Sequence, residues 1–560
     1  MKNKVSILIT GPAGLGIQTI ENLICKIFKK ACFNIFSTKE YMSRVRGGAN
    51  TTTIIICERK INAFYENIDI LLSLYKNGIG RIKDRVKEDT LILGDVEKED
   101  KKTFKIDFLK IAKEIGDIVY SNSIAVGVLL GLFQKEKEIS ENIISEMFKT
   151  KGEETIKKNI IALNYGYFIG KEIKEKTNFR FEIKSDENIR DEIFLNGAES
   201  VGIGAIIGGC NFVSSYPMTP STPLFTFLAQ NSKKFNIVVE QAEDEISAIN
   251  MVLGSWYAGG RGLVTTSGGG FSLMVESLSL AGMIESPIVI HLGQRPGPAT
   301  GLPTRTEQGD LLFSIFAGHG EFPRIILSPG DLSEGILLTE KAFNLADKYQ
   351  IPVIILTDQY FIDTFYNIKI PPVDLKPKYY FSENIKFDYK RYKFIEDGVS
   401  ERGIPGGNGF VCVDSDEHDE EGHITEDRNI RKLMVEKRNK KIKKFIDTEI
   451  INPSFFGNKD YEILLISWGS TKNIVLSAIE NIENEKIGYL HFPLVWPLPK
   501  IIDEYIRKSK KTIVIENNYN SQFSKLIKME TGIEIKEKIL KYDGHPFSVE
   551  EIKMEIEKRI

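Results

Sequence analysis

Short apolar runs alternate with stretches of helical periodicity along most of the chain. In the first part, the candidates for buried strands are residues 5–10, 52–57, 68–74 and 91–94. A helix is expected to open at the Gly11–Gly16 turn and to run to about Lys30. Strand-sized runs separated by helices are typical of an α/β layer with a parallel sheet.

The same alternation returns twice further along. The later strand candidates are residues 211–215, 261–265, 288–292, 324–327, 351–357, 463–467, 487–492 and 511–516. Between them lie turn sequences such as Ser328-Pro-Gly-Asp331, which is a favourable start for a helix. We therefore predict a doubly wound parallel sheet in the middle of the chain and a further α/β unit at its end.

Changes in composition divide this pattern into domains. A polar stretch from about Thr177 to Asp191 suits a linker, and charged residues become frequent again after Ser382. Within that second stretch, residues 432–444 form a lysine-rich helical pattern, which we expect to be a solvated helix face. The expected domains are residues 1–178, 193–382 and 453–560, with residues 383–452 as a charged linker and helical segment.

Composition narrows the class of protein. With 42% hydrophobic and 27% charged residues, the 560-residue chain has the composition of a water-soluble globular protein. Its net charge of −3 favours no nucleic-acid partner. No apolar run approaches the ~20 residues that span a bilayer, and the first residues lead directly into a strand pattern, so we expect a cytoplasmic location without membrane contact. None of the five cysteines forms a Cys-x-x-Cys pair, so any iron–sulfur cluster must belong to another chain.

Two glycine-rich sites lie in the first segment. The glycines Gly11, Gly14 and Gly16 have the spacing G-x-x-G-x-G, which differs from the dinucleotide fingerprint. Such a turn binds phosphate through backbone N–H groups or allows tight packing, and the sequence leaves both open. The second site, Arg46-Gly47-Gly48, could hold an anionic group or face a neighbouring domain.

The stretch that most strongly indicates a binding site is Tyr216-Pro217-Met-Thr219-Pro220, which follows a strand candidate. Prolines on both sides of Thr219 restrict the backbone and present a small hydroxyl rigidly. A stiff turn before a helix would explain part of the pattern. Three prolines within seven residues around hydroxyl groups favour a binding role.

Two charged residues follow neighbouring strands. Glu245 is the last of four acids at a helix start, where acids are common because they meet the helix dipole, but it also precedes an apolar helical stretch and is expected to point inward. Arg295 follows the strand at 288–292 in a loop stiffened by proline and glycine, and its guanidinium matches a carboxylate. Ligands of parallel sheets collect at such strand ends. The segment Glu417–His423 holds potential metal ligands, but in a polar stretch where such residues are usually solvated, so we expect no metal site.

At Tyr216–Pro223, Glu245 and Arg295 the sequence resembles the 2-oxoacid:ferredoxin oxidoreductases of the 2-oxoglutarate synthase type. Residues 1–178 resemble the family's gamma subunit, fused ahead of an alpha subunit. The alpha part resembles a doubly wound thiamine-diphosphate pyrimidine-binding domain, followed by a transketolase C-terminal-like α/β domain. Further matching stretches are Gln294–Thr304, Glu307–Asp310, Glu417–Asp427, Trp468–Thr471 and Glu516–Asn518.

The resemblance implies a mechanism. Thiamine diphosphate with Mg²⁺ would lie between this chain and a beta subunit, with Glu245 on the aminopyrimidine ring and the glycines Gly268 and Gly269 beside the coenzyme. Thr219 and Arg295, with Tyr216 and Pro217, would hold the substrate carboxylate. Gly11, Gly14, Gly16 and the Arg46–Gly48 site would form a loop for coenzyme A or another anion.

The resemblance also implies partners. The chain has no Gly-Asp-Gly motif for the diphosphate and Mg²⁺, so a beta subunit would supply that motif and the iron–sulfur cluster in an (αβ)₂ assembly that reduces ferredoxin. The expected reaction is the coenzyme A-dependent oxidative decarboxylation of a 2-oxoacid, with 2-oxoglutarate as the first choice. Alternatives are a subunit for pyruvate or branched-chain 2-oxoacids, a non-redox thiamine enzyme subunit, and a catalytically silent nucleotide-binding or scaffold protein on the same α/β fold.

Overall fold

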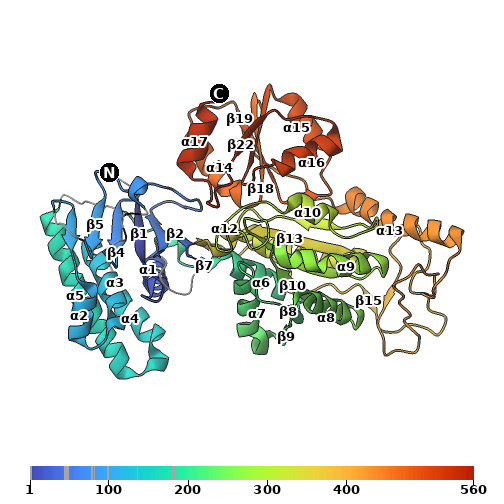
Figure 1. Cartoon of the computed structure of the whole chain (residues 1–560), viewed down its shortest axis with the longest axis horizontal. Helices are drawn as coiled ribbons and strands as arrows, with labels where there is room; N and C mark the ends of the chain where they lie inside the picture. The colour runs from blue at the N-terminus through green and yellow to red at the C-terminus, as the bar shows by residue number, and fades with distance from the viewer. Residues whose placement is uncertain are drawn as a thin grey trace. The chain divides into compact units, whose positions relative to one another are not determined.

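The computed structural model describes residues 3–42, 49–76, 78, 80, 82–96, 100–134, 137–177 and 183–560. The chain forms two compact units (Figure 1). Unit 1 comprises Met1–Leu195, Asp363–Ile370 and Ser548–Glu550, and unit 2 comprises Asn196–Ile362, Pro371–Phe547 and Glu551–Ile560. The domain boundaries given above stay a prediction.

Unit 1 is built on a mixed sheet. Across the described residues its strand order is β6-β5-β4-β1-β3-β2-β14-β7. The strands are β1 (Lys4–Pro12), β2 (Asn34–Glu40), β3 (Ala49–Cys57), β4 (Ile70–Ser73), β5 (Leu91–Gly94), β6 (Thr103–Lys105), β7 (Ile193–Asn196) and β14 (Phe365–Ile368). The sequence pattern predicted a parallel sheet, which is wrong for part of it, because β3 pairs antiparallel with both β1 and β2. Strand β2 escaped prediction because its second half, Ser37-Thr-Lys-Glu40, is polar.

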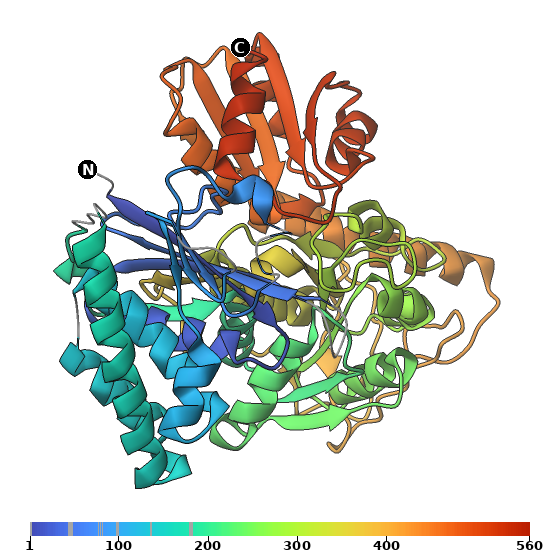
Figure 2. The ribbon, with the colours of Figure 1, turned by 60° about the vertical axis from the view of Figure 1, so that its left-hand side comes forward.

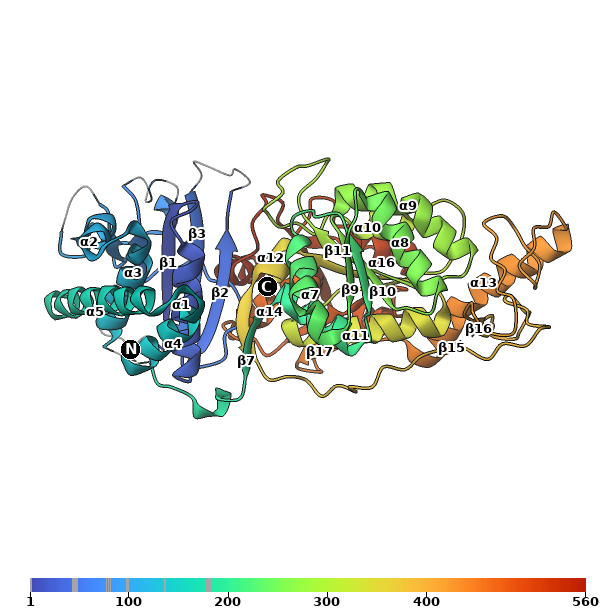
Figure 3. The ribbon, with the colours of Figure 1, turned by 90° about the horizontal axis from the view of Figure 1, so that it is seen from below.

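The helices of unit 1 gather against the sheet (Figure 3). They are α1 (Ile17–Lys30), α2 (Phe108–Ile115), α3 (Ser121–Phe133), α4 (Lys137–Met147) and α5 (Glu153–Lys176). The larger of two apolar clusters formed by described residues of the unit joins these helices to one face of the sheet, including Val5, Ile7 and Ile9 of β1. Leu8, between them, points to the smaller cluster on the other face. This alternation is the period-2 pattern of a strand buried on both faces.

Unit 2 contains the predicted doubly wound sheet. Its strand order over the described residues is β20-β12-β13-β11-β10-β8-β9. The strands are β8 (Phe212–Ser215), β9 (Val238–Gln241), β10 (Gly262–Thr266), β11 (Ile288–Gln294), β12 (Ile325–Leu327), β13 (Pro352–Asp358) and the antiparallel β20 (Leu494–Trp496). All neighbouring pairs from β12 to β9 are parallel, so their carboxyl ends share one edge.

The order of connections decides which helices cover which face. The helices are α6 (Gly197–Ile207), α7 (Thr222–Phe235), α8 (Glu245–Tyr257), α9 (Gly268–Met283), α10 (Leu311–Phe316), α11 (Leu332–Tyr349) and α12 (Gln359–Asp363). The connections β8-α7-β9 and β12-α11-β13 run one way across the sheet, while β9-α8-β10 and β10-α9-β11 run the other way. Because parallel crossovers are right-handed, α7 and α11 lie on one face and α8 and α9 on the opposite face.

Unit 2 also contains a second sheet, which is parallel except for its antiparallel edge strand β17. Its strand order over the described residues is β17-β19-β18-β21-β22. The elements are β17 (Ser454–Gly457), β18 (Ile463–Trp468), β19 (Ile487–Phe492), β21 (Lys511–Glu516), β22 (Glu537–Leu540), α14 (Lys472–Ile479), α15 (Ile502–Lys508), α16 (Gln522–Thr531) and α17 (Val549–Glu557). This orange and red layer carries helices on both sides of its strands (Figure 2). The expected α/β class with several layers is confirmed.

The segment between the two layers contains β15 (Phe381–Ser382), β16 (Arg402–Gly403) and α13 (Arg428–Glu449). The prediction that this lysine-rich helix is solvated is wrong for one face. Lys437, Arg438 and Lys441 are almost fully buried, and Lys437 Nζ lies 2.7 Å from Glu285 Oε2. A charged helix can pack inward when carboxylates at its contact surface neutralise it.

Candidate functional site

Four consecutive loops of unit 2 follow strands at one edge of the sheet. Residues 216–223 follow β8, Glu245 comes shortly after β9, Ser267–Gly270 follow β10, and Arg295 follows β11. The carboxyl ends of parallel strands share an edge. The chain moves outward from β8 to β9 and then back past β8 to β10, so the direction of the connections reverses beside β8. A crevice for ligands forms at such a reversal point. The fold thus gathers the predicted binding residues of the alpha-like part at one place.

Thr219 and Arg295 are in direct contact. Arg295 Nη1 donates a hydrogen bond to the main-chain oxygen of Thr219 at 2.6 Å, across 76 positions of sequence. Arg295 Nε is buried without a partner, so the guanidinium keeps an N–H for a further acceptor. Burial lowers the pKa of Arg295, and the carboxylate of Asp310 opposes that shift.

Glu245 is the first residue of α8 and lies inside the protein. Its neighbour Asp244 caps the helix by accepting a hydrogen bond from Ser247 N at 2.7 Å, which leaves Glu245 free to turn inward. The side chain is 3% exposed, and Oε1 has no hydrogen-bond partner. A buried carboxylate oxygen without a partner is costly, so this position suits a carboxylate that meets a ligand.

The first turn of α9 closes the site on another side. A Cβ atom on Gly270 would lie 2.6 Å from Glu245 Oε1, and one on Gly268 would lie 2.7 Å from Asp310 Oδ2. Glycine is therefore needed at both positions for the acids to approach the helix backbone. Ser267 Oγ, immediately before the helix, is buried without a partner. The nearest neighbour of a Cβ on Gly269 would be 4.0 Å away, so the backbone there is open.

Two acids at this site were missed as functional residues. Asp310 precedes α10 but does not cap it, and its Oδ2 is buried without a partner. Burial raises the pKa of Asp310 to about 6, against the opposing effect of Arg295. Burial and the charge of Asp310 raise the pKa of Glu307 to about 7. The stretch Glu307–Asp310 was noted only as a family match; its chemistry depends on burial, which its sequence does not reveal.

The C-terminal layer holds the Glu307–Asp310 loop in place. Gln308 Nε2 donates to Trp468 O at 2.9 Å, and its Oε1 accepts from Asn517 N at 2.9 Å. Gln294 Oε1 accepts from Asp310 N at 2.9 Å, directly beside Arg295. The family-like stretches Trp468–Thr471 and Glu516–Asn518 are thus structural supports of the site.

The remaining candidates are two residues of the loop after β8 and the glycine-rich sites of unit 1. Tyr216 is exposed and Pro217 half-buried at the start of their loop. In unit 1, Gly14 and Gly16 adopt positive φ angles of 95° and 75°, and α1 begins after Gly16 without a side-chain cap. Arg46, Gly47 and Gly48 lie outside the described residues.

The Glu417–His423 segment is occupied by internal contacts. Glu417 accepts two hydrogen bonds from Arg438, at 3.0 and 2.8 Å, and the His418 ring lies 4.0 Å from that of Tyr392. In the part of the chain that the structure describes, no group of three or more histidine, cysteine or acidic side chains is placed to hold a metal ion. Nor does any described helix combine the length and apolar composition needed to cross a bilayer.

The chemistry of the site fits a coenzyme with a protonatable ring and a carboxylate substrate. Its unpaired buried atoms are Glu245 Oε1, Asp310 Oδ2, Arg295 Nε and Ser267 Oγ. The acids can share a proton with a ring nitrogen, and the guanidinium can bind a carboxylate. The aminopyrimidine end of thiamine diphosphate therefore fits these residues.

Comparisons with known proteins identify the family that the chain resembles. The family model described as pyruvate flavodoxin/ferredoxin oxidoreductase, thiamine diP-bdg, matches residues 203–437, and that described as pyruvate ferredoxin/flavodoxin oxidoreductase matches residues 6–169. A 2-oxoacid:ferredoxin oxidoreductase subunit alpha from Sulfolobus sp. is 33% identical over 98% of this chain and 96% of that one. The 2-oxoglutarate synthase subunit KorA of Methanothermobacter marburgensis is 32% identical over 65% of this chain and 97% of that one.

A solved structure extends the similarity to the whole fold. The 2-oxoglutarate:ferredoxin oxidoreductase from Magnetococcus marinus, with 2-oxoglutarate, coenzyme A and succinyl-CoA bound, is similar with a TM-score of 0.91 and 31% identity over 100% of both chains. The chain belongs to the 2-oxoacid:ferredoxin oxidoreductase family, as one of its alpha subunits.

Proposed function

We propose that this chain, together with a beta subunit, catalyses the coenzyme A-dependent oxidative decarboxylation of 2-oxoglutarate, with ferredoxin as the electron acceptor. The convergence of Glu245, Asp310 and Arg295 at the carboxyl edge of the sheet is the observation that carries the proposal. The similarity to KorA and to the Magnetococcus marinus enzyme supports 2-oxoglutarate over pyruvate and branched-chain oxoacids.

Glu245 would hold the aminopyrimidine ring of thiamine diphosphate through its unpaired Oε1 and keep a proton at the ring nitrogen. The backbone at Gly269 is open and would lie beside the ring, and Gly268, whose missing side chain leaves room for Asp310, would precede it there. When bound, the coenzyme supplies the electron sink that decarboxylation requires. The beta subunit would hold its diphosphate and Mg²⁺ and carry the iron–sulfur cluster.

Arg295 would bind the carboxylate of the oxoacid that leaves as CO₂. Its Nη1 is already engaged by the main-chain oxygen of Thr219, which fixes the plane of the guanidinium and leaves Nε for the substrate. The Thr219 hydroxyl would add a second hydrogen bond to the same carboxylate, with Tyr216 and Pro217 shaping the loop. Such prior orientation lowers the entropy cost of binding.

The turn at Gly11, Gly14 and Gly16 and the Arg46–Gly48 site would bind an anionic part of coenzyme A. The support is the uncapped start of α1, whose first N–H groups suit an anion. Replacing Arg46 by alanine should raise the KM for coenzyme A and leave the KM for the oxoacid unchanged.

A comparison of kcat/KM among three oxoacids tests the proposal. The chain should be co-purified with the beta subunit, and viologen reduction measured with 2-oxoglutarate, pyruvate and 2-oxoisovalerate at saturating coenzyme A. We expect the highest kcat/KM for 2-oxoglutarate. A higher kcat/KM for either other acid would overturn the substrate assignment but keep the reaction class, and coenzyme A-independent turnover without electron transfer would overturn the class.

A further inference from the structure

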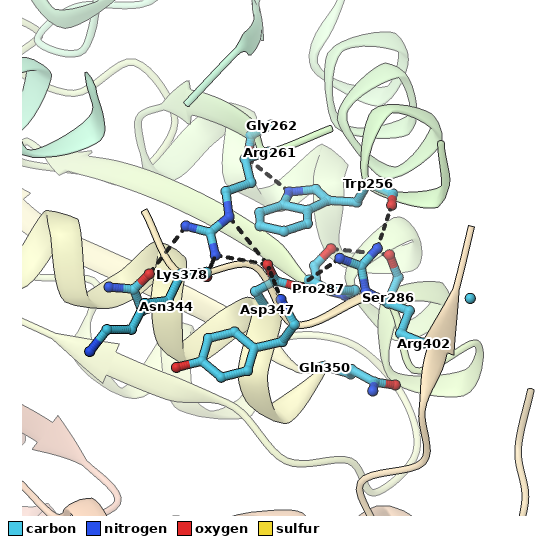
Figure 4. A network of polar contacts seen from close by, with 12 residues as sticks. Trp256, Arg261, Gly262, Ser286, Pro287, Asn344, Asp347, Gln350, Lys378 and Arg402 are labelled. Carbon is cyan, nitrogen blue, oxygen red and sulfur yellow. Dashed lines mark hydrogen bonds and ion pairs between the residues drawn. The ribbon is translucent and has the colours of Figure 1, made fainter. Parts of the chain in front are cut away.

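Two buried ion networks lie at the edge of the unit 2 sheet opposite the candidate site. In the first, Asp347 of α11 accepts from two arginines (Figure 4). Arg261, at the start of β10, lies 2.8 Å from Asp347 Oδ2, and Arg402 of β16 lies 2.6 Å from Oδ1. Arg261 and Asp347 have no exposed side-chain surface, and that of Arg402 is 4% exposed. One carboxylate therefore faces two buried guanidiniums.

The second network centres on Glu285, which follows α9. Lys437 Nζ donates to both of its oxygens, at 2.8 and 2.7 Å, and Lys441 pairs with Oε2. Arg391 Nη2 donates to the main-chain oxygen of Glu285 at 2.8 Å. Burial lowers the pKa of Lys441 to about 7, with Glu285 opposing the shift and the charge of Lys437 adding to it.

The two networks together bury more positive than negative charge. Their cations are Arg261, Arg391, Arg402, Lys437 and Lys441, whereas their carboxylates are Asp347 and Glu285. The charges of Arg391 and Arg402 interact, so the two networks are electrostatically one region. Even with Lys441 neutral, two positive charges in this region lack a buried counter-charge among the described residues. Uncompensated buried charge is strongly unfavourable, so an additional negative charge is expected nearby.

A small, partly open cavity is lined in part by both Arg391 and Arg402. Its volume is about 20 Å³, and its lining includes Arg391, Arg402 and Ser286 together with apolar side chains such as Trp256 and Val411. Arg391 is 3% and Arg402 4% exposed, yet Arg391 Nη1 and Arg402 Nε have no hydrogen-bond partner. A space of this size has room for one small occupant, such as a water molecule or a monatomic ion.

We propose that this cavity binds a single halide ion, chloride under ordinary conditions, between the guanidiniums of Arg391 and Arg402. A monatomic anion accepts hydrogen bonds from both unpaired N–H groups and reduces the buried positive charge, whereas a water molecule would do only the first. In the sequence, both arginines lie in the segment that connects the two layers of unit 2. Trp256 and Ser286 belong to the doubly wound layer. The ion therefore stabilises the packing of that segment against the layer that carries the candidate site.

The test combines solution and crystal measurements on the chain purified with its partner subunit. Thermal unfolding is followed while sodium bromide or chloride replaces sodium methanesulfonate at constant ionic strength. We expect the midpoint to rise with the logarithm of halide concentration, as a specific site requires. Crystals grown in bromide should give an anomalous peak in contact with Arg391 Nη1 and Arg402 Nε.

Matched variants separate this site from general salt effects. Arg391→Gln should abolish the halide dependence, and Arg431→Gln, which changes an exposed arginine paired with Glu417, should preserve it. If Arg391→Gln does not fold, the anomalous map of the unaltered protein decides. No peak in the cavity overturns the proposal, since the occupant is then water. A peak without halide-dependent stability also overturns the proposal, because the peak then represents an adventitious ion only.

Discussion

At the scale of single residues, the site depends on polar atoms that are buried but left without partners inside the chain. Glu245 is the clearest case, since Asp244 takes the capping role that would otherwise occupy an acid at this helix start. The sequence pattern placed Glu245 inward correctly because an apolar helical stretch follows it. It could not assign Asp310, whose neighbours Gln308 and Gly309 give no sign of burial.

Replacing Glu245 by glutamine should lower kcat of the assembled enzyme by about 10²–10⁴-fold, because an amide cannot hold a proton at the coenzyme ring as a carboxylate does. Viologen reduction at saturating thiamine diphosphate measures this. The control is Glu243→Gln, which alters an exposed acid two residues earlier and should leave kcat unchanged. A large loss in the control variant instead would transfer the role to Glu243.

Arg295→Ala should lower kcat/KM for the oxoacid by roughly ten- to a hundredfold, because a charged hydrogen bond contributes ~1.5–3 kcal/mol and ~1.4 kcal/mol corresponds to a factor of ten. Thr219→Val keeps the shape and removes only the hydroxyl, so it should cause a smaller loss in the same parameter. The KM for coenzyme A should stay constant in both variants. If the KM for coenzyme A rose while kcat/KM for the oxoacid stayed constant, Arg295 would bind coenzyme A instead.

The raised pKa of Asp310, about 6, predicts pH-dependent substrate binding. Below this pH the carboxyl is neutral, and above it the carboxylate repels the oxoacid and weakens the field of Arg295. The KM for the oxoacid should therefore rise about tenfold between pH 5 and pH 8, since ~1.4 kcal/mol of repulsion corresponds to a factor of ten. Asp310→Asn should flatten this rise. An identical pH profile in the variant would show that Asp310 does not face the substrate.

At the scale of elements, the strands that carry the site were predictable, and the partners of the charged helix were not. Buried parallel strands such as β11 and β13 have long apolar runs, which single them out in a sequence. The lysines of α13 pair with Glu285, about 150 positions earlier in the chain. Nothing local distinguishes Lys437 from a solvated lysine such as Lys432, so long-range pairing of this kind escapes a sequence pattern.

Glu285→Gln should destabilise unit 2 by about 3–5 kcal/mol, because it leaves two buried ammonium groups without a counter-charge. Asp397→Asn removes the charge of the partner of Lys444, whose side chain is 33% exposed, and should cost no more than about 1 kcal/mol. Denaturant unfolding of both variants measures the difference. Equal losses would mean that the buried pairs contribute no more than the surface pair.

The pH dependence of stability provides a second readout for Glu285. Burial alone would raise its pKa, but Lys441, Lys437 and Arg391 outweigh burial and hold the pKa well below the ordinary value of 4.5. A depressed pKa gives stability that is complete above pH 4.5 and is lost as the pH falls below it. Glu285→Gln should therefore show a shallower loss of stability between pH 4.5 and pH 3 than the unaltered protein.

At the scale of the whole molecule, the proposed function divides the catalytic centre between this chain and a beta subunit. The four strand-end loops hold groups for a ring nitrogen and a carboxylate, while the sequence contains neither a Gly-Asp-Gly motif nor a Cys-x-x-Cys pair. Thiamine diphosphate has a ring end and a diphosphate end, and this chain provides charged partners suited to the first. Membership of the alpha subunits of the family agrees with this division.

The isolated chain should therefore be colourless and inactive, and co-expression with the beta subunit should give a brown complex that reduces methyl viologen with a 2-oxoacid and coenzyme A. The colour arises because iron–sulfur clusters need cysteine thiolates, and the five cysteines here are separate, four of them buried. Burial also raises the pKa of Cys25 and Cys210, which keeps both thiols protonated. Visible absorption and viologen assays of the two preparations measure this. Turnover by the isolated chain would show that the division of labour between subunits is wrong.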